Sequence, residues 1–225
     1  DYKRLEYEMH LLHNEYTGGL KLGASTTVAQ YVLPPLLASF IGKFPHVNLS
    51  LLNGNSREIE AALQEHRIDL GFVEGVFRLP NIKYTTFLKD ELVAVVRTGS
   101  KLAIGEEITP EELLHLPLVL RERGSGTLDV FERALQQHNI KLSSLQVLMY
   151  LGSTESIKLF LEHTDCLGIV SIRSITRELY SGQLRVVEIK DMPMLRDFSF
   201  AQPQGQESGL AQVFMQFAMH YNNKL

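Results

Sequence analysis

Short polar side chains recur at four points where an apolar, strand-like run gives way to a helical pattern. Ser25 follows "LKLGA", Asn55 follows "VNLSLLNG", Gly124 follows "PLVLRER" and Ser153 follows "LQVLMYLG". In open parallel sheets, ligands bind beyond the carboxyl ends of the strands, where helix N-termini present unpaired N–H groups. Hydroxyl and amide groups there can also donate hydrogen bonds to an anion. The candidate ligand-binding residues are Ser25, Thr26, Thr27, Asn55, Ser56, Gly124, Ser125, Thr127, Ser153 and Thr154.

Each junction also has a simpler interpretation, because Ser, Thr and Asn are the preferred N-caps of any helix. A single junction of this kind is best explained as a cap. Four of them, two in each half of the chain, favour a binding site that both halves share.

Charged residues refine the ligand that this site would take. Arg121 and Arg123 flank Glu122 at the end of a strand, and strand alternation predicts both arginines on one face with Glu122 opposite. An arginine at the site would bind a carboxylate or oxyanion through its planar guanidinium, whereas the alternative is a surface ion pair. Glu74, after "LGFV", would favour a ligand group that donates hydrogen bonds; the alternative is a solvated loop residue.

Motifs for catalysis are missing from the sequence. The "GSG" at 124–126 lacks the G-x-S-x-G pattern of a nucleophile elbow, and neither a P-loop nor G-x-G-x-x-G occurs. His10 and His13 are three apart but have no clear third metal ligand. Cys166 lies in "HTDCLGIV", where a free cysteine is usually a small core residue. We therefore expect no catalytic residue, no metal and no cofactor.

The elements that must position these residues alternate between strand and helix. The alternation runs over about residues 20–75 and starts again over about 115–172. Alternation with short apolar strands predicts an α/β fold, with a mostly parallel sheet covered by helices. We expect two α/β subdomains, with "ELVAVVRTG" leading out of the first and "RDFSFAQ" leading back.

Composition restricts the classes of partner. The 225 residues suffice for one large domain or two of about 100 residues each. The net charge of −4, with no basic stripe, argues against DNA binding by this part itself and against binding to an acidic membrane surface. No apolar run is long enough to span a bilayer.

The ends and the single cysteine suggest a context for the chain. One cysteine, Cys166, allows no internal disulfide and fits a reducing cytosol. The charged, amphipathic N-terminus does not resemble a signal peptide. Because the sequence begins with Asp1 rather than Met, we expect a fragment or a processed chain.

Residues 1–16 have a helical pattern with a coiled-coil spacing. The apolar positions that produce this spacing are Tyr2, Leu5, Met9, Leu12 and Tyr16. Two heptads are too short to form a stable helix alone. Either this helix lies on its own domain, or it is the end of a longer linker helix that pairs with a second copy.

The segment "GGLKLGASTTVAQYVLPPLLASFIGKFPHVNLSLLNGNSREIEAALQEHRIDLGFVEG" resembles the effector-binding domain of LysR-type transcriptional regulators. "YVLPPLLASFIGKFPHVNLSLLNGN" is similar to the helix–Pro–strand signature of the family, and "RERGSGT" to a motif of one branch. That branch motif usually has Pro at the position of Arg123 and Arg at the position of Leu128, so the positive charge is moved here. The resemblance covers roughly residues 18–225, and 1–16 resemble the end of the family's linker helix.

The resemblance implies a fold of two Rossmann-like subdomains joined by two crossover strands, as in type 2 periplasmic binding proteins. The implied division is 1–17 as the end of the linker helix, 18–92 plus 196–225 as subdomain I, and 93–195 as subdomain II. The cleft between the subdomains would bind a small organic acid, amino-acid derivative or inorganic anion. By motif position the contacts would come from Ser25, Thr27, Ser125, Thr127 and Thr154.

The resemblance also implies partners. Two copies would pair side by side, with "AQYVLPPLLASFIGKF" of one against "LDVFERALQQH" of the other, as a dimer or tetramer. DNA would be bound only by an N-terminal winged helix-turn-helix that this sequence lacks, and the protein would be cytoplasmic. An effector would act by shifting a population between domain arrangements.

Two other classes share this fold. A solute-binding protein of a transporter has the same two-lobed cleft, but a coiled-coil seam before it would be unexpected. An enzyme on the same fold would need an acid–base pair in the cleft, and the sequence offers no clear one. We therefore expect a non-enzymatic sensor.

Overall fold

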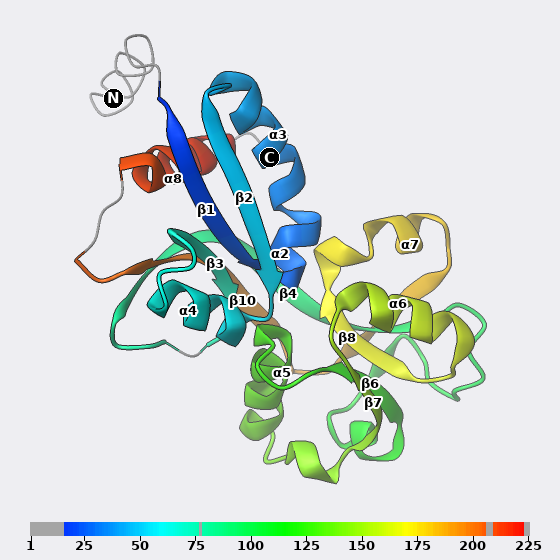
Figure 1. Ribbon diagram of the computed structural model, residues 1–225. Coiled ribbons are helices and arrows are strands. Elements are labelled where there is room, and N and C mark those ends of the chain that lie inside the picture. Colours follow the sequence, from blue (N-terminus) through cyan, green and yellow to red (C-terminus); the bar gives the residue numbers. More distant parts are fainter. Residues whose placement is uncertain (1–15, 77, 206–208, 223–225) are drawn as a thin grey trace.

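The protein folds into two α/β lobes connected by two long strands (Figure 1). The computed structural model describes residues 16–76, 78–205 and 209–222. The predicted linker helix at 1–16 therefore lies outside the described residues, except for Tyr16, whose ring packs edge-on against Phe44 at 5.6 Å.

Lobe I is built on three parallel strands in the order β2-β1-β3. Its strands are β1 (Gly18–Ser25), β2 (Val47–Gly54) and β3 (Leu70–Glu74). Its helices are α2 (Thr26–Tyr31), α3 (Leu33–Lys43), α4 (Ser56–Gln64) and α8 (Gly209–Asn222). In α4, Ile59, Ala62 and Leu63 form the buried face, as their spacing predicts.

Lobe II repeats this arrangement, with parallel strands in the order β8-β6-β7. Its strands are β5 (Glu107–Ile108), β6 (Pro117–Arg121), β7 (Gln146–Leu151), β8 (Leu167–Ser171) and β9 (Leu184–Ile189). Its helices are α5 (Gly126–Gln137), α6 (Thr154–His163) and α7 (Thr176–Tyr180), and its 3₁₀ turns are η1 (Glu111–His115), η2 (Leu142–Ser144) and η3 (Ile172–Ser174). In each lobe, the first of the three parallel strands named here lies between the other two. The predicted repetition of architecture is therefore present.

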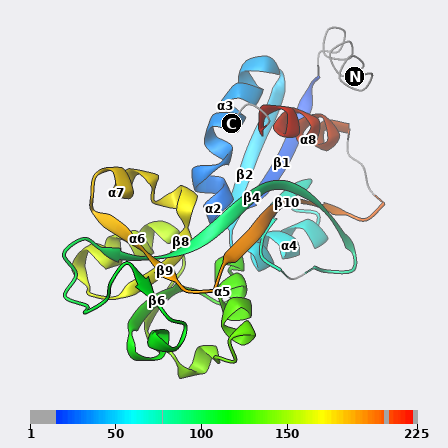
Figure 2. The same cartoon turned by 180° about the vertical axis from the view of Figure 1, so that it is seen from behind.

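The lobes are joined by β4 (Ile82–Arg97) and β10 (Met194–Pro203), which run antiparallel beside each other (Figure 2). In lobe I, β10 also pairs with β3, and in lobe II, β4 also pairs with β8 and β9. The parallel strands of both lobes thus belong to one hydrogen-bonded path.

Each lobe has its own hydrophobic core. In lobe I, aromatic rings pack between the sheet and its helices; Phe72 lies 5.0 Å from Phe200 and Phe40 lies 4.8 Å from Phe214, between ring centroids. In lobe II, Leu120 of the sheet packs in one cluster with Phe131 of α5. The described residues form four buried hydrophobic clusters, two in each lobe, as expected for a sheet with helices on both faces.

The first helical segment differs from its prediction. The run "AQYVLPPLLASFIGKF" forms two helices that break at Val32, rather than one. Pro34 and Pro35 follow the break, in the first turn of α3. Proline has no backbone N–H group, and its absence costs least there because the N–H groups of the first turn have no partner within the helix. Helix α2 also begins earlier than expected, so Thr26 and Thr27 lie in its first turn.

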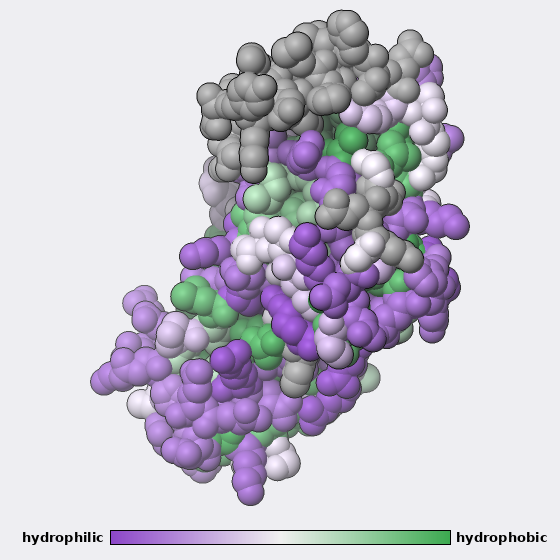
Figure 3. Space-filling model, turned by 90° about the vertical axis from the view of Figure 1, so that its left-hand side faces the viewer, coloured by the Kyte–Doolittle hydropathy of each residue, from purple (hydrophilic) through white to green (hydrophobic). Residues whose placement is uncertain are grey.

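The surface seen from the side of α4 is mostly hydrophilic, with hydrophobic residues in separate patches (Figure 3). In the described part of the chain, no helix is both long and apolar enough to cross a membrane.

Candidate functional site

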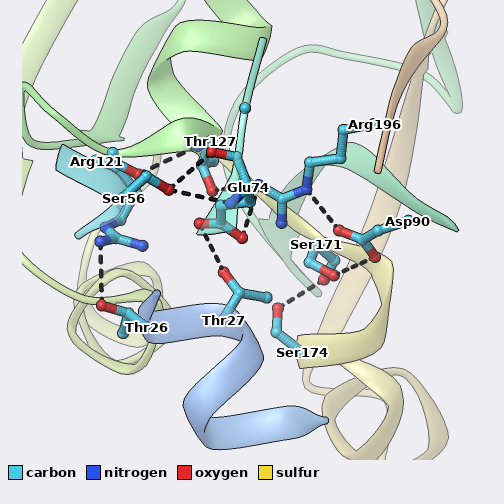
Figure 4. A network of polar contacts seen from close by, with 12 residues as sticks. Thr26, Thr27, Ser56, Glu74, Asp90, Arg121, Thr127, Ser171, Ser174 and Arg196 are labelled. Carbon is cyan, nitrogen blue, oxygen red and sulfur yellow. Dashed lines mark hydrogen bonds and ion pairs between the residues drawn. The ribbon is translucent and has the colours of Figure 1, made fainter. Parts of the chain in front are cut away.

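The predicted residues of both lobes meet where the lobes face each other (Figure 4). β1, β3 and β6 end at this junction, and α2, α4, α5 and α6 begin near it. The predicted residues that are buried there are Ser25, Thr26, Thr27, Ser56, Glu74, Arg121, Ser125, Thr127 and Thr154. Folding therefore brings together short polar side chains from both halves of the chain.

Arg121, at the end of β6, is the most unusual member because its large side chain is only 1% exposed. Nε and Nη2 donate to the Glu122 carboxylate at 2.8 and 3.0 Å. Nη2 also lies 3.5 Å from Thr26 Oγ1 across the junction and 3.4 Å from the Gly152 carbonyl oxygen. Nη1 is buried and has no hydrogen-bond partner within residues 16–76, 78–205 and 209–222. Leaving such a donor unpaired costs about 1–3 kcal/mol, so this atom is available for a ligand acceptor.

Ser25 provides a second unused polar atom. It is the N-cap residue of α2, yet its side chain makes no capping hydrogen bond. Its Oγ is buried and has no partner among the described residues. The simple capping interpretation therefore fails at Ser25, although Ser25 has the residue type and position of a cap.

Thr26 and Thr27 are both occupied. Thr26 Oγ1 donates to the carbonyl oxygen of Gly54 at 3.2 Å. Thr27 Oγ1 donates to Glu74 Oε1 at 3.3 Å. Glu74 is thus a buried carboxylate at the end of β3 rather than a solvated loop residue.

Arg196 of β10 compensates Glu74. Its Nη1 lies 3.1 Å from Glu74 Oε2 and donates to Thr127 Oγ1 at 3.0 Å. Its Nε donates to Asp90 Oδ2 at 2.7 Å, and Asp90 Oδ1 accepts from Ser171 Oγ at 2.7 Å. This series of contacts connects lobe I, both crossover strands and lobe II. Buried charges are costly unless they have partners of this kind.

Four predicted residues have other partners. Asn55 caps α4 in a capping box with Glu58, and Ser153 caps α6 by accepting from the Ser156 N–H. Ser56 Oγ accepts from the Glu74 N–H at 3.1 Å and is 2.7 Å from the Glu74 carbonyl oxygen. Arg123 pairs with Glu132 at the surface and is 66% exposed. The capping interpretation therefore describes Asn55 and Ser153, and the surface interpretation describes Arg123, whereas Ser56 is buried against the backbone of Glu74.

The predicted face of Arg121 and Arg123 is wrong. Arg121 is buried beside Glu122, not opposite it, while Arg123 points to solvent. The reason is that β6 ends at Arg121, so strand alternation no longer applies beyond it. The chain turns at once, with Gly124 at a φ of 94° and the Ser125 N–H donating to the Glu122 carbonyl oxygen.

The start of α5 approaches lobe I closely. Ser125 Oγ accepts from the Thr127 N–H at 3.2 Å, which caps the helix. At Gly126 an added Cβ would lie 2.2 Å from the Glu74 carbonyl oxygen, so only glycine fits. A Cβ added at Gly124 would lie 3.1–3.3 Å from atoms of the Asn55 side chain, which is a tight contact.

A second bridge lies on the α6 side of the junction. Tyr31 of α2 donates to Glu155 of α6, and Lys158 contacts both. Burial, followed by the hydrogen bond to Glu155, raises the pKa of Tyr31. Burial acts to raise the pKa of Glu155, but the hydrogen bonds from Lys158 and Tyr31 outweigh it and lower that pKa below its usual value. Tyr31 therefore favours its neutral phenol form, and Glu155 favours its charged carboxylate form.

Sequence reasoning missed Asp90, Arg196, Ser171 and Tyr31. The two charged residues lie in strands that also contain long apolar runs, and they are direct partners in the β4–β10 register. A charged residue in each of the two crossover segments was a signal, but only the pairing shows that they meet.

Comparison with known proteins identifies this arrangement. Residues 13–222 match the family model described as the LysR substrate binding domain. The HTH-type transcriptional regulator YeiE of Escherichia coli strain K12 is 34% identical over 182 residues, which are 81% of this chain and 61% of YeiE. CysL of Bacillus subtilis strain 168, also an HTH-type regulator, is 26% identical over 88% of this chain and 66% of CysL. This chain thus spans under two thirds of the length of YeiE.

Two solved structures have the same fold. The CcmR regulatory domain of Synechocystis PCC6803, in complex with 2-PG, superposes with a TM-score of 0.83 at 27% identity and covers 93% of this chain and 99% of that one. The effector binding domain of QuiR, in complex with shikimate, gives 0.81 over 93% and 99%, and at 20% identity it shows the fold alone.

The matched residues include all of the junction described above, and the relatives are transcriptional regulators. They do not favour the alternative of a transporter's solute-binding protein. The chain belongs to the LysR substrate-binding domain family, with the fold of two Rossmann-like lobes that LysR effector-binding domains share with type 2 periplasmic binding proteins.

Proposed function

We propose that this domain senses a small anionic metabolite that binds between the lobes, at Arg121 and Ser25. This proposal depends on one observation: Arg121 Nη1 and Ser25 Oγ are buried at the junction, and neither has a hydrogen-bond partner in the part of the chain that the structure describes. A carboxylate or phosphate oxygen would satisfy a guanidinium N–H through a charge-assisted hydrogen bond. The complex of the CcmR regulatory domain with 2-PG supports binding of a small molecule by a domain of this fold.

The neighbouring side chains restrict the ligand further. Glu74 Oε1 already accepts from Thr27, and Glu74 Oε2 is ion-paired with Arg196 Nη1 at 3.1 Å. A ligand hydroxyl near Glu74 could donate to it, whereas a second anionic group there would be repelled. The effector is therefore a hydroxylated acid or a compact anion. The other residues that we place at or next to it are Thr26, Asn55, Ser56, Gly124, Ser125, Thr127, Ser153 and Thr154, with Arg123 outside the contact zone.

The contact that the ligand would replace is weak. Arg121 Nη2 and Thr26 Oγ1 are 3.5 Å apart, at the limit of hydrogen-bond length. Since lobe I contributes Ser25 and lobe II contributes Arg121, an anion bound to both would favour one lobe arrangement. The anion shifts the populations of the lobe arrangements only as far as its affinities for those arrangements differ. Coupling free energies of about 1–3 kcal/mol are usual. We place the lobe boundaries at 18–92 plus 196–225 and at 93–195.

Self-association belongs to the same proposal. Exposed apolar residues lie on both edge strands of the sheet, with Leu51 and Leu52 on β2 and Leu148 and Met149 on β7. On the adjacent helices, Ile41 of α3 and Leu159 of α6 are exposed. The described residues of α5 include no exposed large apolar side chain. We therefore place lobe I of one copy, by β2 and α3, against β7 and α6 of the other, rather than against α5.

In the whole protein, this domain would regulate a DNA-binding helix-turn-helix domain in the cytoplasm. Its relatives named HTH-type transcriptional regulators support this role. The junction holds a guanidinium and hydroxyls committed to binding rather than an acid–base pair, so we infer a sensor without catalytic activity.

A thermal-shift screen of small hydroxy acids and phosphorylated acids tests the proposal, since a ligand that binds the folded state raises its apparent stability. We expect at least one acid to raise the unfolding midpoint of the unaltered chain and of Arg123→Gln, but not of Arg121→Gln or Ser25→Ala. Arg123→Gln is the matched control, because it removes an arginine that points to solvent two residues away. An acid that stabilises all four proteins equally would refute binding at this junction.

A further inference from the structure

The charge of Arg121 is cancelled by the residue that follows it in the sequence. Its Nε and Nη2 donate to the two carboxylate oxygens of Glu122, at 2.8 and 3.0 Å. Two parallel hydrogen bonds of this kind fix the plane of a guanidinium group. They also leave Nη1 outside the edge that Glu122 occupies, buried and without a hydrogen-bond partner among the described residues. Arg121 therefore offers a ligand a well-placed donor, but not an uncompensated positive charge.

The ion pairs on the Glu74 side of the junction are balanced as well. Arg196 contacts Glu74 at 3.1 Å and Asp90 at 2.7 Å. The Asp90 carboxylate also lies 3.6 Å from the guanidinium of Arg173. Two cations thus face two carboxylates, so this side adds no surplus of positive charge to the site.

A third group of charges lies on the α6 side of the junction, next to Tyr31. Lys158 lies 2.8 Å from Glu155 and 2.7 Å from Glu178, so one ammonium group faces two carboxylates. The charge of Arg177 also acts on Glu155 and restores the balance. In each of the three groups, the number of cations therefore equals the number of carboxylates.

We propose that Glu122 limits the effector to a single negative charge, so that the site selects a monocarboxylate over a dicarboxylate or a doubly charged phosphate. The inference rests on the proposed function, since it concerns the ligand that Arg121 and Ser25 would hold. A ligand carboxylate at Nη1 gains charge-assisted hydrogen bonds and lies closer to the guanidinium than to Glu122, which occupies another edge. One negative charge is therefore accommodated.

A second negative charge on the ligand would lack such a partner. Arg121 and Glu122 together act as a dipole, whose attraction decreases more steeply with distance than that of a lone cation. A charge farther along the ligand would meet the balanced groups and the carboxylate of Glu74, which repels it. Taking a charge out of water costs free energy that only a partner can offset. Without Glu122, the whole charge of Arg121 would act on the second group.

Calorimetric titration of this chain with sodium lactate, and separately with sodium malate, tests the charge limit at neutral pH and constant ionic strength. Both are hydroxy acids, and malate carries one carboxylate more. We expect lactate to bind the unaltered chain more tightly than malate. In Glu122→Gln, which removes the negative charge at nearly constant side-chain size, the affinity for malate relative to lactate should rise about three- to tenfold. The ratio of the two affinities is the readout because a general loss of stability lowers both affinities alike.

Two further variants separate charge from shape and from position. Glu122→Asp keeps the carboxylate and should keep the ratio of the unaltered chain. Glu162→Gln removes one negative charge from an exposed position of α6 and should also leave the ratio unchanged. A shift of the ratio in Glu122→Asp as large as in Glu122→Gln would overturn the proposal, as would an unchanged ratio in Glu122→Gln. Tighter binding of malate than of lactate by the unaltered chain would overturn it without any variant.

Arg121→Gln distinguishes a failure of this inference from a failure of the proposed function. If lactate binds Arg121→Gln as tightly as the unaltered chain, the ligand site lies elsewhere and both fail. If Arg121→Gln abolishes the binding while Glu122→Gln leaves the ratio unchanged, only the charge limit fails. Absence of saturable binding of both acids by the unaltered chain and by Glu122→Gln also overturns the charge limit, whereas the thermal-shift screen with other anions still tests the proposed function.

Discussion

Asp90 and Arg196 are direct partners on the two crossover strands, and their charged groups meet 2.7 Å apart with both side chains buried. The pair does more than neutralise itself, because Arg196 also reaches Glu74 and Thr127 on either side of the junction. A strand pair that carries the chain between lobes thus also carries a charge network between them.

Replacing Arg196 with Met should destabilise the domain strongly. Glu74 would then lose its ion pair and Asp90 would keep only Arg173, at 3.6 Å. Losing one partner of a buried pair costs about 3–5 kcal/mol. Arg123→Gln breaks an exposed pair and should cost about 0–1 kcal/mol. Urea unfolding followed by circular dichroism measures both. Equal losses would contradict a central role for Arg196.

Replacing Ser25 with Ala should stabilise the ligand-free domain slightly while it weakens effector binding. The buried Oγ has no partner, so its removal relieves an unsatisfied group. The expected gain is about 0.5–1 kcal/mol in the free energy of unfolding. Ser125→Ala is the control, because it removes a capping hydrogen bond to the Thr127 N–H and should cost about 1 kcal/mol. A loss at Ser25 as large as at Ser125 would show that its hydroxyl is paired.

Replacing Gly126 with Ala should destabilise the contact between α5 and lobe I. The added Cβ would lie 2.2 Å from a backbone oxygen of Glu74, so the lobes must move apart. Overpacking of this kind costs about 1–3 kcal/mol or more. Gly42→Ala is the control: it lies in α3 with nothing within 4 Å, and alanine should stabilise that helix. Unfolding midpoints of both variants give the comparison.

Stability should fall at alkaline pH through Tyr31. Its pKa is raised in the folded state, so its contribution is fully present below the ordinary value of 10.0 and declines as the pH rises above it. Tyr31→Phe should make the loss of stability above pH 10 shallower. In an absorbance titration, the variant should have one tyrosine fewer that ionises only well above pH 10. An unchanged slope would mean that the phenol ionises freely in the fold.

At acidic pH the sign is opposite for Glu155. Its folded pKa lies below 4.5, so the stability it contributes is present above that value and is lost as the pH falls through the lowered one. Glu155→Gln should remove this part of the acid sensitivity. Glu162→Gln, on the same helix, provides the comparison in acid unfolding curves.

Cys166 should be unreactive in the native protein. It is buried in the core of lobe II, and burial raises the pKa of its thiol to about 11. The nucleophilic thiolate is therefore scarce at neutral pH. A thiol-reactive chromogenic disulfide should label it only as the domain unfolds, at the rate of unfolding. Rapid labelling of the native domain would show that the thiol is accessible.

Much of the fold could be predicted from the sequence because local patterns specify it. The alternation of apolar strands with amphipathic helices such as α4 predicts parallel strands, and both lobes have them. The length of β4 was underestimated, since its first half, from Ile82, alternates buried and exposed residues less regularly. The break at Val32 was also missed, although Pro34 and Pro35 were its signal.

The site was harder to predict, because residue type cannot distinguish a cap from a ligand contact. Asn55 and Ser25 occupy equivalent positions before a helix, yet one makes a capping box and the other makes no bond. Arg121 of the other lobe lies 3.5 Å from Thr26, the neighbour of Ser25, and the residues around Ser25 do not reveal this contact. Long-range pairing, such as that of Asp90 with Arg196, has no local pattern at all.

The link between the lobes consists of two hydrogen-bonded strands with one irregularity, at Phe198 and Ser199. Adjacent strands twist more strongly in a two-stranded ribbon than in a wider sheet. Movement between the lobes should therefore be a rotation about the ribbon axis, with the irregular step as its softest point. A signal that passes through this domain would be a change in the angle between the lobes rather than in the distance between them. The part of the protein that responds must therefore respond to that angle.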